Sequence, residues 1–251
     1  MKSRIDKNYW LFNVAVAHRG LFDENCPENT LPAFENAIKN GYAIETDVHM
    51  TTDGVLICYH DNNVKRLCGV DRDIRTMSFS EVQELEILSS GLKIPTFKQV
   101  LDFVDGQVPL CIELKQQKNK GLEEKLVELL REYKGEFVIQ SFDPFMVRRV
   151  QKLEKSFIRG VLTTNEKLPG YPKIVDYLMQ RFFFKLFVKF DFLNIRIEDL
   201  PFHAKRAKKY NVICWTAKSP NDVQIAKKYA KNVIFEKTAQ DLDVFDKKYV
   251  K

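Results

Sequence analysis

Residues 43–60 read AIETDVHMTTDGVLICYH and hold two short apolar runs, Ala43–Val48 and Val55–Tyr59, with a turn between them. The connection between the runs is six residues long and contains Asp53-Gly54, a pair that is typical of hairpin turns. A parallel crossover needs about a dozen residues or more. The second run therefore predicts a strand that returns antiparallel to the first.

Similar apolar runs recur along the whole chain and alternate with segments of helical periodicity, as in βα repeats around a parallel sheet. Besides the two runs above, strands are expected at Val14–Ala17, Leu110–Leu114, Phe137–Gln140, Ile158–Leu162, Phe192–Ile195, Val212–Trp215 and Asn232–Phe235. Once the hairpin strand is set aside, eight of the nine remain for a closed barrel. The sequence thus predicts an α/β protein with the TIM (β/α)8 fold, as one domain over residues 1–251. A hairpin extends its second strand, and a small insertion lies near residues 61–94.

Several helices have starts that can be read from the sequence. Two pairs have capping-box spacing, and three further positions place a cap residue close to a first-turn proline. The capping boxes are Ser78 with Glu81 and Thr96 with Gln99, and the proline starts are Thr30 with Pro32, Asp143-Pro144 and Ser219-Pro220.

The composition excludes some classes of protein. Hydrophobic residues make up 45% of the chain, so a sizeable core can form and global disorder is not expected. The net charge is +6, from 40 Lys and Arg against 34 Asp and Glu. That balance suits an anionic small molecule or an acidic membrane surface, and the absence of dense basic blocks argues against a nucleic-acid partner.

The cysteines and the N-terminal residues bear on the compartment. The five cysteines form no CxxC pair and their number is odd, which favours reduced thiols and a cytoplasmic protein. No apolar run reaches the ~18–20 residues of a membrane span. Met1–Lys7 and Tyr9–Ala17 together resemble a signal peptide, but the apolar part is short and contains Asn13. We expect a barrel strand there.

Charged side chains stand at the ends of several predicted strands, and a barrel brings such ends to one mouth. Glu45 and Asp47 lie two positions apart, so both carboxylates face the same side of their strand. Glu113 and Lys115 repeat this spacing on a later strand. The set is completed by residues that follow the first strand and the hairpin: His18, Arg19 and His60.

This combination of residues suits the cleavage of a phosphodiester. Carboxylates of Glu45, Asp47 and Glu113 are ligands for a hard divalent cation, Mg2+ or Ca2+. Such an ion polarises phosphoryl oxygens, while Arg19 and Lys115 can neutralise phosphate charge. The two histidines, His18 and His60, supply a general acid and a general base. We favour His60 as the base and His18 as the acid, although nothing in the sequence separates the two roles.

The order of these motifs resembles the glycerophosphodiester phosphodiesterase family, and the resemblance extends over nearly the whole chain. Each motif alone is weak, but their order and spacing together are specific. The matching motifs are His18-Arg19-Gly20, Pro27-Glu28-Asn29-Thr30, Glu45-x-Asp47-Val48, Thr52-Asp53-Gly54, His60-Asp61, Ile94-Pro95, Glu113-x-Lys115, Ser141-Phe142 and Trp215-Thr216.

The resemblance implies a barrel of the phospholipase C-like type that hydrolyses deacylated phospholipids to sn-glycerol 3-phosphate and an alcohol. In the mechanism it implies, the glycerol 2-hydroxyl attacks phosphorus and water opens the resulting cyclic phosphate. His18 and His60 carry over as the acid and base, and Glu45, Asp47 and Glu113 as metal ligands. Arg19 and Lys115 carry over as phosphate contacts, and Phe142 and Trp215 as the glycerol pocket.

The chain departs from the family pattern near its end. Trp215-Thr216-Ala217-Lys218 stands where Trp-Thr-Val-Asn is common, and Phe235-Glu236-Lys237 where the last strand commonly ends in Thr-Asp. The headgroup preference is therefore open. Two rival functions also stay open: a lysophospholipase D, and a barrel without catalysis that serves as a binding module. A third rival, a phosphoinositide-type phospholipase C barrel, shares the two histidines but has no support from the His18-Arg19-Gly20 and Pro27-Glu28-Asn29-Thr30 motifs.

Some residues beside these motifs have two readings. Glu28 and Asn29 either contact the metal or support the site, and His49 lies outside the motif. His203 is expected in a solvated basic helix. Tyr171–Phe190 is expected to form a helix in which the apolar side chains of Phe182–Phe190 lie on nearly every side, either buried or in contact with a membrane or a second copy of the chain.

Overall fold

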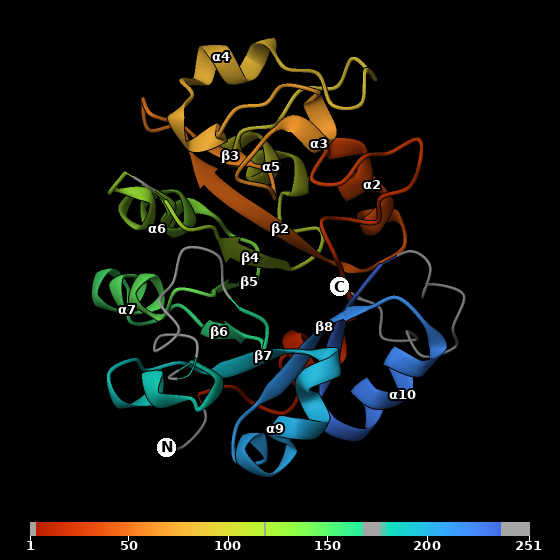
Figure 1. Ribbon diagram of the computed structural model, residues 1–251, viewed down its shortest axis with the longest axis vertical. Coiled ribbons are helices and arrows are strands. Elements are labelled where there is room, and N and C mark those ends of the chain that lie inside the picture. Colours follow the sequence, from red (N-terminus) through yellow and green to blue (C-terminus); the bar gives the residue numbers. More distant parts are fainter. Residues whose placement is uncertain (1–3, 118, 168–176, 178, 237–251) are drawn as a thin grey trace.

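The computed structural model describes residues 4–117, 119–167, 177 and 179–236, and within them nine strands form one sheet (Figure 1). The sheet closes because β1 pairs with both β2 and β9, and the pairs around the barrel are parallel. The barrel strands are β1 (Val16–Ala17), β2 (Ala43–Met50), β4 (Leu110–Leu114), β5 (Phe137–Ser141), β6 (Arg159–Thr163), β7 (Phe192–Arg196), β8 (Val212–Ala217) and β9 (Asn232–Phe235). The predicted (β/α)8 barrel is confirmed.

The ninth strand, β3 (Leu56–Cys58), pairs antiparallel with β2, with Cys58 opposite Val48. Gly54 in the turn has φ 84°, a left-handed conformation that glycine adopts without strain. The short connection therefore forms the hairpin that its length predicted.

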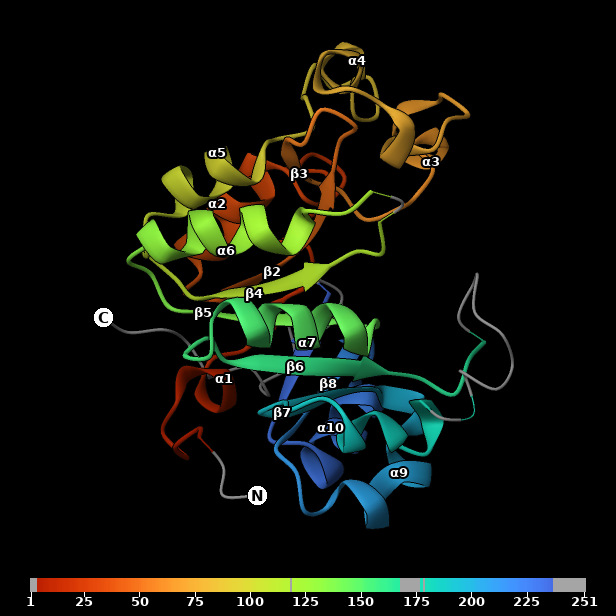
Figure 2. The same ribbon diagram turned by 90° about the vertical axis from the view of Figure 1, so that its left-hand side faces the viewer.

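Helices cover the outside of the barrel between successive strands (Figure 2). They are α2 (Leu31–Lys39), α5 (Phe97–Val104), α6 (Leu122–Glu132), α7 (Pro144–Leu153), α9 (Leu200–Ala207) and α10 (Pro220–Tyr229). The side chains of Ser78, Thr96, Asp143 and Ser219 cap helices as predicted. Thr30 precedes α2, but its hydroxyl donates to the Pro27 carbonyl oxygen at 2.6 Å instead of capping the helix.

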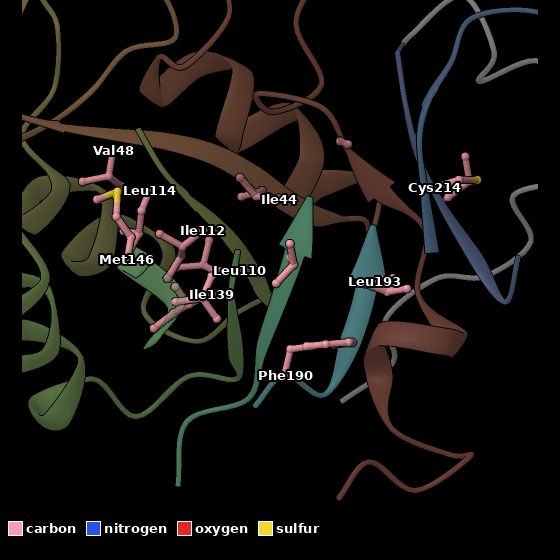
Figure 3. Packing of buried hydrophobic residues seen from close by; sticks show 14 of the residues in the cluster. Ile44, Val48, Leu110, Ile112, Leu114, Ile139, Met146, Phe190, Leu193 and Cys214 are labelled. Atoms are coloured by element: carbon pink, nitrogen blue, oxygen red, sulfur yellow. The ribbon is translucent and has the colours of Figure 1, made fainter. Parts of the chain in front are cut away.

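Alternate residues of each strand face opposite sides of the barrel wall. Outward-facing side chains of β2 and β4 pack with helix residues in the main core, and Figure 3 shows Ile44, Val48, Leu110, Ile112 and Leu114 there with Met146 of α7. The residues that alternate with them, Glu45, Asp47 and Glu113, consequently face the barrel interior.

The chain enters the barrel through a short helix, α1 (Trp10–Asn13), and not through a strand that begins at Val14. Trp10, Leu11 and Phe12 pack on interior residues near the starts of the barrel strands. The side-chain amide of Asn232 donates to the Leu11 and Val14 carbonyl oxygens at 2.8 and 2.6 Å. The apolar N-terminal segment therefore closes the end of the barrel opposite the carboxyl ends of the strands.

The predicted insertion forms a small lobe beyond β3 (Figures 1 and 2). It contains α3 (Lys65–Cys68), a 3-10 turn η1 (Ile74–Thr76) and α4 (Phe79–Glu84). A cluster of its own holds the lobe together, built from Ile57, Tyr59, Val64, Leu67, Ile74, Met77, Val82, Leu85, Ile87 and Ile94.

Two expectations about the second half of the chain are wrong. Of the expected helix over Tyr171–Phe190, residues 171–176 and 178 lie outside the described residues, and Phe182–Phe190 contains a single 3-10 turn, η2 (Phe183–Leu186). Buried Phe182 and Phe184 anchor this turn on the barrel at both sides of Phe183. His203 is fully buried, since its ring stacks on Phe182 and its Nε2 lies 3.0 Å from the Asn165 side-chain oxygen. Among the described helices, none has the length and apolar character to cross a membrane.

Candidate active site

Three carboxylates meet inside the barrel towards the carboxyl ends of β2 and β4. Glu45 and Asp47 lie on β2, and Glu113 is the register partner of Asp47 on β4. Oxygen atoms of the three side chains lie within 4.8 Å of one another, and all three residues are buried. Strand parity thus brings together the three carboxylates that the sequence predicted as metal ligands.

Two cations accompany this cluster. Lys115 Nζ lies 2.8 Å from Glu113 Oε1 and 3.3 Å from Asp47 Oδ1. Arg19 donates its backbone N–H to Glu45 at 2.9 Å, and its Nε lies 3.7 Å from Asp47 Oδ2. Three carboxylates against two cations leave one negative charge in a buried site.

The pKa values of Glu45 and Asp47 shift in opposite directions in this site. Burial raises the pKa of Glu45, and the nearby charges of Asp47 and Glu113 raise it further. Burial acts in the same direction on Asp47, but Lys115, His60 and Arg19 outweigh it and lower the pKa of that carboxyl. The neighbouring cations therefore keep Asp47 ionised. Glu45 needs a further positive charge nearby to lose its proton.

The donor set fits a hard divalent cation. Carboxylate oxygens are the ligands that Mg2+ and Ca2+ prefer. Asp47 Oδ1 is buried and accepts no hydrogen bond from the described residues, even though Lys115 is near. Asp47 Oδ2 is held by the Asn29 side-chain amide at 2.9 Å, which fixes the orientation of the carboxylate. An oriented carboxylate with one unsatisfied oxygen is the arrangement that a cation completes.

The turn after β1 needs its glycine. Arg19 and Gly20 both have left-handed backbone conformations, with φ 55° and 81°. A Cβ atom on Gly20 would lie 2.9 Å from the backbone of Ala33 and from the ring of Phe34. Close packing of the turn on α2 thus requires glycine and directs the Arg19 backbone N–H at Glu45.

His18 follows β1 and pairs with a residue at the opposite end of the sequence. Its Nδ1 lies 3.1 Å from Glu236 Oε1, which Lys218 Nζ also contacts at 3.0 Å. Burial lowers the pKa of His18 despite the Glu236 carboxylate, so the ring is neutral near pH 7. Since a carboxylate only accepts hydrogen bonds, Nδ1 carries the proton and Nε2 is left as the basic nitrogen.

His60 has an equivalent carboxylate partner at the end of the hairpin. Its Nδ1 lies 2.6 Å from Asp61 Oδ1, and Asp61 Oδ2 accepts from Arg66 Nε at 2.6 Å. Arg66 also donates two hydrogen bonds to Glu28, whose Oε1 accepts from Arg19 at 2.7 Å. Glu28 therefore binds two arginines and lies outside the carboxylate cluster, while Asn29 supports it.

His49 lies fully buried below this loop. Its Nε2 is 3.4 Å from the His60 carbonyl oxygen, and its Nδ1 is 3.0 Å from the Gln117 side-chain amide. Burial lowers the pKa of His49 to about 3, so the ring stays neutral. The residue packs against the loop of His60, and the charges of Lys115 and Asp47 act on its ring.

Two aromatic residues lie at the ends of β5 and β8, as the sequence predicted for a pocket wall. The rings of Phe142 and Trp215 are 5.5 Å apart in an edge-to-face arrangement with an interplanar angle of 84°. Both side chains are partly exposed. The two rings thus form an apolar pair at the carboxyl ends of these strands.

A (β/α)8 barrel with buried carboxylates and two histidine–carboxylate pairs at its strand ends defines a barrel of the phosphodiesterase type. The sequence model of the glycerophosphoryl diester phosphodiesterase family matches residues 18–236, and the chain belongs to this family. The match begins at His18 and ends at Glu236, the two residues of one pair.

Individual relatives agree with this membership. A glycerophosphodiester phosphodiesterase of Caldanaerobacter subterraneus is 32% identical over 59% of this chain. The matched part covers 66% of that relative's length, just under two thirds. YhdW of Bacillus subtilis is 30% identical over 80% of this chain and 84% of its own length. The solved structure of an Oleispira antarctica phosphodiesterase, a complex with the product sn-glycerol-3-phosphate, has the same fold. Its TM-score is 0.72 at 21% identity, over 93% of this chain and 96% of that one.

Two residues of the site, Glu236 beside His18 and Arg66 beside Asp61, were not predicted from the sequence. Glu236 was noted only as a departure from the family pattern, and its distance of 218 positions from His18 hid the contact. Arg66 carried no signal, because a cation in a polar insertion looks like any solvated residue. Its six-residue distance from His60 was the available clue.

Proposed function

We propose that the protein hydrolyses glycerophosphodiesters to sn-glycerol 3-phosphate and an alcohol, with a divalent cation as cofactor. The observation that carries the proposal is the cluster of Glu45, Asp47 and Glu113 within 4.8 Å. Family membership over residues 18–236 supports the substrate class. The Oleispira complex with sn-glycerol-3-phosphate agrees with that product.

The proposed reaction assigns two roles to the charged residues, cation binding and phosphate binding. Glu45, Asp47 and Glu113 would hold the cation. When bound, Mg2+ or Ca2+ supplies polarisation of the phosphoryl oxygens and a lower pKa of the attacking hydroxyl. Arg19 and Lys115, which lie beside the carboxylates, bind the remaining phosphate oxygens.

Bond formation and cleavage are assigned to the two histidines. One ring accepts the proton of the glycerol 2-hydroxyl as that oxygen attacks phosphorus. The other ring gives a proton to the alcohol oxygen as its bond to phosphorus breaks. The roles then reverse, so that water opens the cyclic phosphate and both rings return to their starting states. Glu236 and Asp61 each hold the Nδ1 of one ring, His18 and His60 respectively, which leaves Nε2 for proton transfer.

Phe142 and Trp215 are proposed as the apolar wall for the glycerol carbons. The retained histidines and carboxylates argue against a barrel without catalysis. We place the protein in the cytoplasm, since its five cysteines are all free thiols and three of them are buried.

A lysophospholipase D activity is the second candidate. Exposed Phe145 lies three residues beyond Phe142, so an apolar surface begins close to the proposed pocket wall. That surface would suit a substrate that retains an acyl chain.

A substrate panel tests both candidates. Purified protein is incubated with glycerophosphocholine, glycerophosphoethanolamine, glycerophosphoglycerol or lysophosphatidylcholine, each with Mg2+ or Ca2+, and the released alcohol is measured. Turnover of at least one soluble diester is expected. Turnover of lysophosphatidylcholine alone would favour the second candidate, and no turnover of any of the four would refute both.

A further inference from the structure

Large apolar side chains gather on one side of the barrel, where η2 lies beside α7 (the teal turn below α7 in Figure 1). Phe183 and Phe187 are each 40% exposed, Phe145 on α7 is 53% exposed and Leu186 is 74% exposed. These four residues make up nearly half of the large hydrophobic side chains that the described part of the chain exposes. Single exposed apolar residues are ordinary on protein surfaces, but a group of this size is not.

Ring stacking and the geometry of the turn join the four side chains in two pairs, and Leu186 and Phe187 are consecutive residues. The rings of Phe145 and Phe187 stack at 5.3 Å with an interplanar angle of 20°. Phe183 and Leu186 are three residues apart on a 3-10 turn, so they point the same way.

Buried neighbours hold the exposed side chains in place. Phe182 stacks on His203, and Phe184 packs edge to face on Phe190, with ring centroids 4.9 and 5.4 Å apart. Phe182 and Phe184 flank Phe183 and are fully buried. The segment is therefore anchored by alternate residues, and its other aromatic side chains are directed outwards by that anchoring.

The charges within the two segments that carry this surface have one sign, although Asp143 borders the first segment and accepts a hydrogen bond from the Phe145 backbone N–H at 2.7 Å. Residues 144–153 and 179–190 contain no Asp or Glu. Their exposed cations are Arg148, Arg149, Lys152, Arg181, Lys185 and Lys189. Within the described part of the chain, ion pairs on these two segments involve only Arg149, which binds Glu123 at 2.6 Å. We call Phe145, Phe183, Leu186 and Phe187 with the five remaining cations the aromatic–basic surface.

We propose that the aromatic–basic surface docks on a membrane that carries anionic headgroups. Aromatic and aliphatic side chains partition into the interface, and basic side chains beside them are attracted to anionic lipid. A second copy of the chain fits less well. A symmetric dimer contact would bring the five cations of one subunit face to face with the same five of the other, which repels the two subunits.

Docking in this place would bring the site close to lipid. Phe145 lies in the first turn of α7, three residues after Phe142 at the end of β5. The aromatic–basic surface therefore borders the carboxyl ends of the strands, where the candidate site lies. The docking inference stands apart from the proposed reaction, because vesicle binding is measured without turnover.

Vesicle co-sedimentation of the full chain tests the inference. Wild-type protein is mixed with vesicles of phosphatidylcholine alone or of phosphatidylcholine with phosphatidylglycerol, at low and high salt. We expect binding to the anionic vesicles at low salt and little to the others. Phe145→Ser with Phe187→Ser should reduce the partition coefficient by about tenfold or more, and Lys185→Glu with Lys189→Glu by a similar factor. Phe103→Ser on α5, another exposed phenylalanine, is the matched control and should bind as wild type.

Three measurements complete the test. Thermal unfolding should show that all variants are folded, and turnover of a soluble diester should be unchanged in them. Sedimentation velocity should show a monomer for wild type. Wild-type protein that ignores anionic vesicles overturns the inference. A wild-type dimer that Phe145→Ser with Phe187→Ser dissociates also overturns it, because a second copy would then cover the surface.

Discussion

Arg66 donates hydrogen bonds to both carboxylate oxygens of Glu28, at 2.9 and 2.7 Å, although the two residues belong to different lobes of the protein. Arg66 lies on α3 of the insertion, and Glu28 precedes the first barrel helix. A third bond reaches Asp61, the partner of His60, while Glu28 also binds Arg19. One guanidinium thus connects the two loops that carry the candidate histidines.

Replacement of Arg66 should affect turnover more than binding. We expect Arg66→Gln to lower kcat by roughly ten- to a hundredfold, since Asp61 and Glu28 lose the group that orients them. Arg66→Lys should recover only part of this loss, because an ammonium cannot form the forked contact. Steady-state kinetics over a pH series would measure kcat, KM and any shift of the profile.

Arg72→Gln is the control for this experiment. Arg72 lies in the same insertion and binds Glu81 at 2.9 Å, away from the site. Its replacement should leave kcat near the wild-type value. Equal losses in the Arg66 and Arg72 variants would mean that the insertion acts only through its stability.

Glu236 should contribute stability that depends on pH. Burial alone would raise its pKa, but the hydrogen bonds from His18 and Lys218 lower it to about 2. A folded-state pKa below the unfolded value of about 4.5 stabilises the fold above pH 4.5. The contribution is lost as the pH falls towards 2. Urea unfolding of wild type and Glu236→Gln should differ by about 1–3 kcal/mol at pH 6 and converge near pH 2–3. A constant difference across this range would contradict the assigned pKa.

The roles of the two histidines can be separated by the leaving group. His18→Ala and His60→Ala should each lower kcat on glycerophosphocholine by about a hundredfold or more. With 4-nitrophenol as the leaving alcohol, protonation matters much less. We therefore expect one of the two variants, the one that lacks the general acid, to recover. Recovery of both variants, or of neither, would argue against a division into acid and base.

Cation binding should depend on the carboxylate cluster. Isothermal titration of the wild type with Ca2+ should show one site, and Asp47→Asn should weaken it by at least about tenfold. Glu123→Gln is the matched control, since Glu123 is equally buried but pairs with Arg149. Unchanged Ca2+ affinity in Asp47→Asn would move the cation away from this cluster.

The sequence predicted the barrel well because its signals are local. The hairpin followed from the length of one connection, and the bounds of β4 and β9 were predicted to the residue. Residue parity along β2 and β4 placed Glu45, Asp47 and Glu113 on one face, and their pairing follows from the register of two strands. The alternation of side chains along a strand and the length of a short connection are local features, so they can be predicted without knowledge of distant contacts.

What could not be predicted depends on distant contacts. The helix α1 forms because Trp10, Leu11 and Phe12 fill the closed end of the barrel, and that cavity exists only after the strands have met. His203 in a basic helix gave no sign of the ring of Phe182 that covers it. Glu236, the partner of His18, lies 218 positions away, and Arg66, which holds the Asp61 partner of His60, belongs to the polar insertion, so periodicity identifies neither residue.

Cation-dependent cleavage of a glycerophosphodiester is tested most directly by phosphorus NMR. Metal-free wild-type protein is mixed with glycerophosphocholine and glycerophosphoglycerol, and spectra are recorded before and after addition of Mg2+ or Ca2+. We predict no reaction at first, and then a signal of sn-glycerol 3-phosphate that grows after one of the ions is added. The Glu113→Gln variant should stay silent under both conditions. Full release of glycerol 3-phosphate by exhaustively chelated protein, or equal rates in Glu113→Gln and wild type, would contradict a cation-dependent phosphodiesterase at this site.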